Sequence, residues 1–375
     1  MAFRRAARTH LYGLGTALPE HASPQESIHR FMTRLSHAAW GRGQSEARRL
    51  LDSVYAGSGI GARHSVLPDY LAESPELFEF YPPNWTLEPF PTTAQRMVTY
   101  ERSSVDLAAS AARRALAQAG ARPEDVTHLI FTTCTGFFAP GPDILLMEAL
   151  GLRRDLTRSV IGFMGCYAGF NGLRDADHAL AADPEAVVLQ VCLELCTLHF
   201  QKRPEPDFIV ANSLFSDGAS AAVYAAPGRF PKALARLVAS KSRVAAGTLR
   251  QMSWRIGSTG FEMRLDREVP LQLGTAVPSF TDDLLGEAGL SRPDAAGWVL
   301  HPGGRRIVSA VQRALALDDE DVASAREVLR TCGNMSSATI FFVLKAELMT
   351  APPGPLVALG FGPGLTMEGA VLEKL

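Results

Sequence analysis

The chain has 375 residues, of which 47% are hydrophobic and 20% are charged, and its formal net charge is -2. This length exceeds the size at which a single hydrophobic core stops growing, so we expect two domains or two fused halves. The small net charge gives no global attraction to nucleic acid or to an anionic membrane. No apolar run reaches the ~18 residues of a membrane span, and no long apolar segment follows the basic N-terminal residues as in a secretory signal. We therefore expect a cytoplasmic protein with no nucleic-acid partner and no stable membrane association.

The five cysteines do not form a regular framework. No two of them make a CxxC pair, which argues against a disulfide scaffold and against a zinc site. We expect no metal and a reducing environment. The cysteines are Cys134, Cys166, Cys192, Cys196 and Cys332.

In chain order, the first predicted elements are a strand over residues 10–19 and a helical segment over residues 23–56. Arg48 and Arg49 lie in the helical segment, and Arg63 follows it. Arginines in such a segment are most often a solvated helix face. Alternatively, the three side chains bind the phosphates of a nucleotide-bearing thioester through charge-assisted hydrogen bonds.

The next segment, residues 68–91, is rich in proline and aromatic residues and is predicted to be an irregular surface excursion. Apolar side chains then recur at helical spacing from residue 92 to residue 120, which predicts a helix. This helix ends at Gly120, since glycine is the typical C-cap residue. We predict a buried strand over residues 126–136, a loop, and a helix over residues 144–150.

An apolar run then ends in glycine, presents Cys166, and continues as a helix to about residue 182. At a helix N-terminus the unpaired N–H groups and the macrodipole favour a thiolate, and a thiolate attacks acyl carbonyls. A lone cysteine is more often a buried core residue. A buried strand over residues 186–195 follows, and a loop that begins at residue 212 leads into a small-residue strand ending near residue 224. Helices and strands therefore alternate as in a layered α/β fold.

The second half of the chain repeats the features of the first. Residues 117–131 and residues 286–300 both contain a helix end, a glycine stop, a proline turn and a buried strand. The turn with Cys166 before one helix is matched by a turn with Asn334 before another.

This repetition predicts two βα halves that each present a helix N-terminus toward a shared centre. We place the first half, with the nucleophilic cysteine, at residues 1–226. The second half, residues 227–375, carries a histidine and an asparagine that complete the predicted site.

His301 ends a buried strand and is followed by Pro-Gly-Gly, and Asn334 stands at a helix start. Taken alone, the histidine is more often structural and the asparagine is more often an N-cap. However, cysteine, histidine and asparagine all occur at loop-to-element junctions of a duplicated fold. We therefore interpret them as members of one site.

These three residue types suit one reaction. Cys166, as a thiolate paired with the His301 imidazolium, would attack a thioester and hold the acyl group. His301 and the Asn334 amide would then donate hydrogen bonds to the enolate formed when a malonyl group loses carbon dioxide. An apolar neighbour, Phe215, would discourage water.

The motifs that carry this constellation resemble the type III polyketide synthases, the family of chalcone and stilbene synthases. The motifs are Gly165-Cys-Tyr-Ala-Gly, Leu214-Phe-Ser-Asp-Gly-Ala, His301-Pro-Gly-Gly, Gly333-Asn-Met-Ser-Ser and Gly360-Phe-Gly-Pro-Gly-Leu-Thr. The resemblance covers nearly the whole chain. It implies a thiolase-like α/β fold of five layers, αβαβα, a homodimer, and acyl-CoA and malonyl-CoA as substrates with no permanently bound cofactor.

The resemblance also implies roles for particular residues. Cys166, His301 and Asn334 fall on the catalytic positions, and Phe215 falls on one of two gatekeeper phenylalanines. Residues expected to contact the substrate are Phe215, Cys134, Thr135, Ala139, Cys196, His199, Trp254 and Met263. Residues expected to contact coenzyme A are Arg48, Arg49, Arg63, Gly303 and Gly304.

Departures from the plant pattern bear on the substrate. Met263 replaces the second gatekeeper, and Ala139 stands where plant enzymes carry a methionine directed at the neighbouring subunit's cavity. Cys196 and His199 replace threonines of the plant pocket, and Trp254 falls near a small residue. These changes argue against a phenylpropanoid starter. The chain looks closer to bacterial enzymes that extend fatty acyl starters to alkylresorcinols or alkylpyrones.

Three alternatives remain. A ketoacyl synthase of the initiating kind (ketoacyl synthase III-like) shares Cys-His-Asn and stops after one condensation, although the Gly-Phe-Gly-Pro-Gly segment and Phe215 argue against it. A catalytically silent scaffold would use only its dimer surface. A papain-like hydrolase also uses Cys-His-Asn but lacks the duplicated halves.

Overall fold

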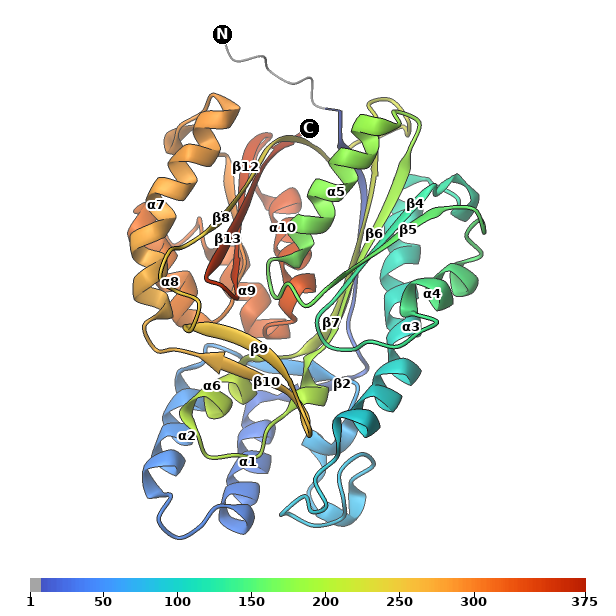
Figure 1. Cartoon of the computed structure of the whole chain (residues 1–375). Coiled ribbons are helices and arrows are strands. Elements are labelled where there is room, and N and C mark those ends of the chain that lie inside the picture. The colour runs from blue at the N-terminus through green and yellow to red at the C-terminus, as the bar shows by residue number, and fades with distance from the viewer. Residues whose placement is uncertain (1–7) are drawn as a thin grey trace.

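One mixed sheet of nine strands runs through the described part of the chain, residues 8–375 of a computed structural model (Figure 1). Its order is β11-β12-β13-β8-β1-β7-β6-β4-β5. Only two residue pairs join β1 to β8, so the sheet consists of two half-sheets that meet at this seam. The strands are β1 (His10–Ala17), β4 (His128–Thr133), β5 (Thr157–Gly162), β6 (Val187–Leu195), β7 (Asp217–Ala225), β8 (Ala235–Val244), β11 (Gly297–Leu300), β12 (Gly354–Gly362) and β13 (Thr366–Lys374).

Helices lie between the two half-sheets and on both outer faces (Figure 1). One outer layer packs on the half-sheet from β1 to β5, and the other packs on β8 and β13. The middle layer contacts strands of both half-sheets. The first outer layer is α3 (Thr93–Ala119) and α4 (Pro142–Leu150), the second is α7 (Val269–Ala288) with α8 (Arg305–Leu315), and the middle layer is α5 (Ala168–Ala182) and α10 (Thr339–Thr350). The predicted five-layer thiolase-like arrangement is confirmed.

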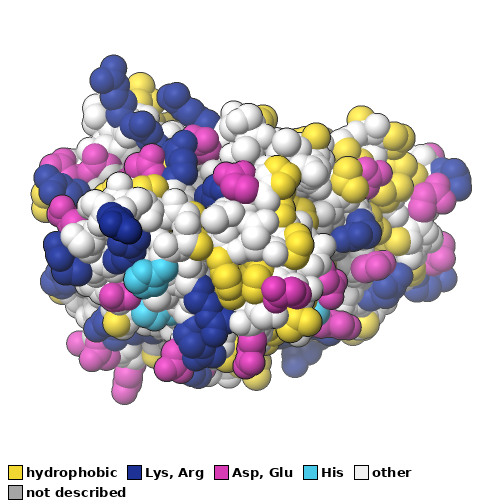
Figure 2. All heavy atoms as spheres, turned by 90° about the horizontal axis from the view of Figure 1, so that it is seen from below, with side chains coloured by type: hydrophobic (Ala, Val, Ile, Leu, Met, Phe, Trp, Pro, Cys, Tyr) yellow, Lys and Arg dark blue, Asp and Glu magenta, His cyan; other side chains and the backbone are white. Residues whose placement is uncertain are grey.

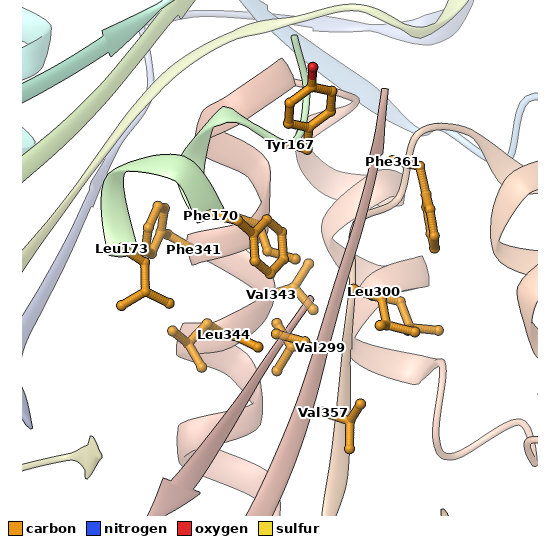
Figure 3. Packing of buried hydrophobic residues seen from close by; sticks show 14 of the residues in the cluster. Tyr167, Phe170, Leu173, Val299, Leu300, Phe341, Val343, Leu344, Val357 and Phe361 are labelled. Atoms are coloured by element: carbon orange, nitrogen blue, oxygen red, sulfur yellow. The ribbon is translucent and has the colours of Figure 1, made fainter. Parts of the chain in front are cut away.

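The middle layer is held by one buried apolar cluster (Figure 3). Phe170 of α5 and Phe341 of α10 belong to this cluster, together with Val299 of β11 and Val357 of β12. A buried aromatic or aliphatic side chain contributes about 1.5–3 kcal/mol each, so this packing fixes both helices firmly. Their N-terminal ends, where Cys166 and Asn334 lie, are fixed with them.

The predicted duplication is visible in the turns that lead into β4 and β11. Helix α3 ends at Gly120 with φ 69°, and α7 ends at Gly289 with φ 71°. Each left-handed glycine is followed by a short 3-10 turn, Pro123–Asp125 in the first half and Arg292–Asp294 in the second. Both turns lead into a parallel strand, as the sequence pattern predicts.

A third group of elements lies at one end of the layers (Figure 1). The predicted single helical segment over residues 23–56 is two helices, because two glycines, Gly41 and Gly43, interrupt it. Residues 212–214, predicted as loop, end a helix instead. An antiparallel strand pair and a hairpin were not predicted. These elements are α1 (Gln25–Ala39), α2 (Ser45–Gly57), α6 (Pro206–Leu214), the antiparallel pair of β2 (His21–Pro24) with β3 (Ala62–Ser65), and the hairpin of β9 (Met252–Gly257) with β10 (Gly260–Leu265). Helix α9 (Ala323–Cys332) precedes the Asn334 turn.

Within residues 8–375, no helix combines the length and the apolar character needed to cross a bilayer. Basic and acidic side chains are interspersed on the face seen from below (Figure 2). That face therefore carries no broad field of one sign.

Strand β1 lies directly against α3, and this contact gives a test of the packing. A Cβ at Gly15 would lie 2.0 Å from the carbonyl oxygen of Ala111. Gly15→Ala is therefore expected to lower the free energy of unfolding by about 3 kcal/mol or to prevent folding. Gly43→Ala, where a Cβ meets nothing within 4 Å, is the control and should change the urea midpoint little. Equal midpoints for the two variants would contradict the packing described here.

Candidate active site

Cys166 lies in a tight turn between β5 and the first residue of α5. Phe163 and Gly165 have φ angles of 60° and 96°, so the chain reverses over only a few residues. The Gly165 N–H donates a hydrogen bond to the Cys134 sulfur at 3.0 Å. Cys166 is 7% exposed and faces a cavity just ahead of the N-terminus of α5. The predicted tight turn that presents Cys166 before a helix is present.

The Gly-Phe-Gly-Pro-Gly segment, which forms the end of β12 and the start of the turn to β13, packs on the Cys166 turn. A Cβ at Gly165 would lie 2.5 Å from Pro363, and a Cβ at Gly362 would lie 2.7 Å from the Tyr167 ring. A Cβ at Gly360 would lie 2.4 Å from Phe170. The motif is glycine-rich because the second half of the chain must approach the cysteine turn this closely.

His301 is presented by the end of β11. Its backbone N–H donates to the carbonyl of Leu359 at 2.9 Å, which continues the pairing of β11 with β12. The side chain is 1% exposed and lines the cavity with Cys166. Neither ring nitrogen has a hydrogen-bond partner among the residues that the structure describes.

Asn334 is fixed on both backbone and side chain. Its N–H donates to the carbonyl of Leu214, and its own carbonyl accepts from the Ser216 N–H, each at 2.9 Å. The side-chain oxygen accepts from the Ser336 N–H at 2.8 Å, and the amide nitrogen donates to the carbonyl of Gly303 at 3.3 Å. Because the oxygen is occupied, Asn334 offers the cavity an N–H donor.

The charge states follow from burial. Burial raises the pKa of the Cys166 thiol to about 11, although hydrogen bonds from the Ser336 and Asn334 side chains lower it. Burial lowers the pKa of His301 to about 4. Burial thus works against the expected thiolate–imidazolium pair, because each charged form loses its hydration and the His301 ring makes no compensating hydrogen bond among the described residues.

A buried carboxylate behind the cysteine was not predicted. Glu194, at the end of β6, is fully buried and accepts hydrogen bonds from the Cys134 N–H and the Thr135 hydroxyl, both at 2.9 Å, and from the Ser337 hydroxyl at 2.5 Å. Burial raises the pKa of Glu194 to about 7, against these hydrogen bonds. The signal in the sequence was a carboxylate in a mainly apolar strand, because a buried carboxylate requires hydrogen-bond partners.

The cavity at Cys166 encloses about 90 Å³ and is mainly apolar. It brings together most of the predicted substrate residues: Cys134, Thr135, Cys196, His199, Phe215, Trp254 and Met263. Ala139 does not join them, because it lies exposed on the loop after Phe138. Ser336 and Thr197 also line the cavity and were not predicted.

One wall of the cavity is rigid. The His199 Nε2–H donates to the carbonyl of Thr135 at 2.7 Å, and its Nδ1 accepts from the Phe261 N–H at 2.9 Å. The ring stacks on Phe261 with a centroid distance of 4.0 Å, and burial lowers its pKa to about 3, so it stays neutral. The Trp254 indole N–H donates to the carbonyl of Cys134 at 2.8 Å. Both side chains are fixed on the cavity side.

Only some of the residues predicted to contact coenzyme A lie at the cavity that contains Cys166. Arg63 is 5% exposed, and its guanidinium donates to Gln25 and to the carbonyl of Phe215. Arg48 donates to backbone carbonyls at the end of α1. Both guanidinium groups thus already bind groups of the fold, although Arg63 also lines the cavity with Cys166. Arg49 is exposed on α2. Of the two glycines, Gly303 lines the cavity, whereas Gly304 only precedes α8.

Comparison with known proteins identifies the family. The model of chalcone and stilbene synthases, N-terminal domain, matches residues 1–227, and that of the C-terminal domain matches residues 236–375. The chain is 32% identical, over 75% of its length and 74% of the relative's, to the alpha-pyrone synthesis polyketide synthase-like Pks18 of Mycobacterium tuberculosis. It is 33% identical over 72% of its length to probable polyketide synthase 1 of Dictyostelium discoideum, of which it spans only 9%.

Among solved structures, PKS-I from the brown alga Ectocarpus siliculosus superposes with a TM-score of 0.89 at 28% identity, covering 98% of both chains. The chain belongs to the chalcone and stilbene synthase family, the type III polyketide synthases, and is an acyltransferase-type enzyme. Members of this family act on coenzyme A thioesters and are typically dimeric.

Glu194 gives a test of the site's electrostatics. Its pKa in the folded protein, about 7, exceeds the ordinary value of 4.5, so its contribution to stability is present below pH 4.5 and is lost as the pH rises through 7. The loss amounts to about 3 kcal/mol, since one pKa unit corresponds to 1.36 kcal/mol. We expect the free energy of unfolding to fall between pH 5 and pH 8 by more in the wild type than in Glu194→Gln. Parallel pH profiles from urea unfolding would contradict the raised pKa.

Proposed function

We propose that the protein loads an acyl-CoA starter on Cys166, extends it repeatedly with malonyl-CoA, and cyclises the product to an alkylpyrone or alkylresorcinol. The starter that we propose is a fatty acyl group. The observation that carries the proposal is the convergence of Cys166, His301 and Asn334 on one apolar cavity. Each condensation consumes one malonyl-CoA, releases carbon dioxide and leaves the extended chain on coenzyme A. Coenzyme A is released when this chain is transferred back to Cys166 for the next cycle.

The residues have distinct roles in this reaction. Cys166 attacks the starter thioester, its proton passes to His301, and coenzyme A leaves with a proton. Because both groups are neutral in the free protein, we place this proton transfer within the loading step. The His301 and Asn334 N–H groups then donate to the thioester oxygen of malonyl-CoA as it loses carbon dioxide. The resulting enolate attacks the acyl carbonyl, and the Cys166 sulfur is released.

The lining of the cavity supports an apolar starter. From Cys166 it extends toward α1, with Ile28 and Met32, and toward α7, with Met252, Met263 and Leu273. A volume of 90 Å³ is below the ~300 Å³ of ordinary ligand sites, so a long acyl chain must displace side chains. Methionines are unbranched and adapt their shape readily, which makes these two directions suitable for the chain.

We also propose a cytoplasmic homodimer. Strand β5 forms one edge of the sheet, and its residues 157–160 are exposed. Val160 is 48% exposed, and Met164, which follows in the chain, is 36% exposed. Phe137 is 39% exposed, and its ring centroid lies 5.7 Å from that of Phe163. An exposed edge strand with apolar side chains beside it is a surface that a second copy would cover. This position would also bring the loop with Ala139 toward the partner.

Mass spectrometry of the products tests the proposed function. Purified protein is given malonyl-CoA and acyl-CoA starters that range from short branched through long-chain to aromatic. We expect cyclic triketides or tetraketides from a fatty starter, and none from Cys166→Ala. A product with a single condensation would instead identify a ketoacyl synthase III-like enzyme, and the absence of any new carbon–carbon bond would remove the proposal.

Trp254→Ala tests which wall of the cavity limits the length of the acyl starter. Removing the indole enlarges the cavity on the side of His199, so we expect kcat/KM to rise about ten-fold for starters longer than the preferred one. Arg255→Ala, one residue further on β9 and exposed, is the matched control and should leave starter preference unchanged. If neither variant changes the preference among starters, the acyl chain of the starter lies toward α1 or α7 instead.

A further inference from the structure

The end of helix α6 leads directly into Phe215, and its last carbonyl groups are bound by other parts of the chain. Such carbonyls have no partner within a helix, so they need donors from elsewhere. The donors come from α1, α2, β3 and the Asn334 turn. The Tyr55 hydroxyl binds the carbonyl of Asn212 at 3.0 Å, the Gln25 amide that of Ser213 at 2.8 Å, the Asn334 N–H that of Leu214 at 2.9 Å, and the Arg63 guanidinium that of Phe215 at 2.8 Å.

Arg63 is the one charged group among these donors. It is 5% exposed and forms no ion pair within residues 8–375, and such a buried charge is costly unless other groups compensate it. The carbonyl end of α6 supplies the negative end of the helix dipole. The Gln25 side-chain oxygen accepts from Nε at 2.9 Å, and the guanidinium lies 5.9 Å from the centroid of the Tyr55 ring. These neighbours fix both the place and the direction of the guanidinium.

The stem of Arg63 contacts the residue that precedes Asn334. A Cβ at Gly333 would lie 2.9 Å from the Arg63 Cγ, so only a glycine permits this approach. Phe215 and Asn334 face each other as an isolated parallel bridge. A displacement of Arg63 would therefore be transmitted to Asn334 by two routes, through the carbonyl of Phe215 and through Gly333.

We propose that Arg63 is a positioning residue, which holds Phe215 and Asn334 in place for the decarboxylation of malonyl-CoA without contacting the reacting atoms. The inference rests on the proposed function. Because the Asn334 amide donates to the developing enolate, its placement affects decarboxylation and condensation. Cys166 is held by a different turn, which packs on Pro363, so loading of the starter does not depend on Arg63.

Direct binding of the substrate by Arg63 is the alternative, because its side chain lines the cavity. The contacts argue against it, since Nε and one terminal nitrogen already donate to Gln25 and to Phe215. The chemistry also argues against it. A cation bound to the malonyl carboxylate would stabilise the ground state and oppose the loss of carbon dioxide.

The test variant is Arg63→Met, which removes the donors and keeps most of the stem that packs on Gly333. We expect kcat for condensation to fall about 100-fold, which a shift of about 1 Å in a reacting group can cause. KM for malonyl-CoA should change little. The burst of coenzyme A released from the starter, measured without malonyl-CoA, should also change little. Arg63→Lys, which keeps the charge and one donor, should recover part of kcat.

The matched control is Arg114→Met. It also removes a guanidinium contact to a backbone carbonyl, that of Thr16, but on the outer layer formed by α3. This variant should leave both the burst and kcat unchanged. Urea unfolding confirms that each variant is folded. If Arg63→Met does not fold, Gln25→Met, which removes the partner of Nε, takes its place with the same expected pattern.

A double-mutant cycle separates positioning from general damage to the fold. Asn334→Ala removes the donor itself, so adding Arg63→Met to it should lower kcat by less than about two-fold. If the two losses multiply instead, Arg63 does not act through Asn334 and the proposal is wrong. A raised KM with an unchanged kcat would also overturn it, and would assign Arg63 to direct binding of malonyl-CoA.

The crystal structure of Arg63→Met gives a readout that needs no turnover. Phe215 and Asn334 should be displaced from their positions in the wild type, and if both stay in place the inference fails whatever the kinetics. If the wild type forms no carbon–carbon bond while the variant displaces Asn334, the positioning role stands and the proposed function fails.

Discussion

The site depends on the close approach of the two half-chains at the Cys166 turn. Pro363, from the second half, occupies the space where a side chain at position 165 would lie. Tyr167, from the first half, occupies the space where a side chain at position 362 would lie. The turn is therefore not formed by the first half alone. Because α5 and α10 pack in one apolar cluster between the half-sheets, any rearrangement of this contact would also displace Asn334. The duplicated fold thus holds Cys166, His301 and Asn334, which come from distant segments, in fixed relative positions.

The same packing determines the electrostatics of the site. Cys166, His301 and Glu194 are each removed from water, and none of them forms an ion pair among the described residues. Burial therefore favours the neutral form of each group, which raises the pKa of the two acids and lowers that of the histidine. A neutral resting site suits a reaction in which charge appears only on the substrate. The Asn334 amide, whose oxygen is already occupied, is a donor in place before that charge develops.

The sequence predicts those parts of the structure that depend on local rules. Glycine stops at Gly120 and Gly289, the periodic helices and the cysteine, histidine and asparagine junctions are all found where expected. The hairpin of β9 and β10 was not predicted, because its strands pair only with each other and carry mixed polarity. Arg63 shows the same limit: beside other arginines in sequence it looks like a surface cation, yet the fold turns it inward to hold Gln25 and the backbone at Phe215. Side-chain direction in irregular segments depends on tertiary contacts that no local pattern encodes.

Burial also determines which arginines have hydrogen-bond or ion-pair partners. Cations that the fold has buried, such as Arg63 and Arg96, are bound to backbone carbonyls. Arg267, just before α7, and Arg306, on α8, have no ion-pair partner among the described residues. They can remain unpaired because the recess between α7 and α8 is open to water, where the cost of an unpaired charge is small.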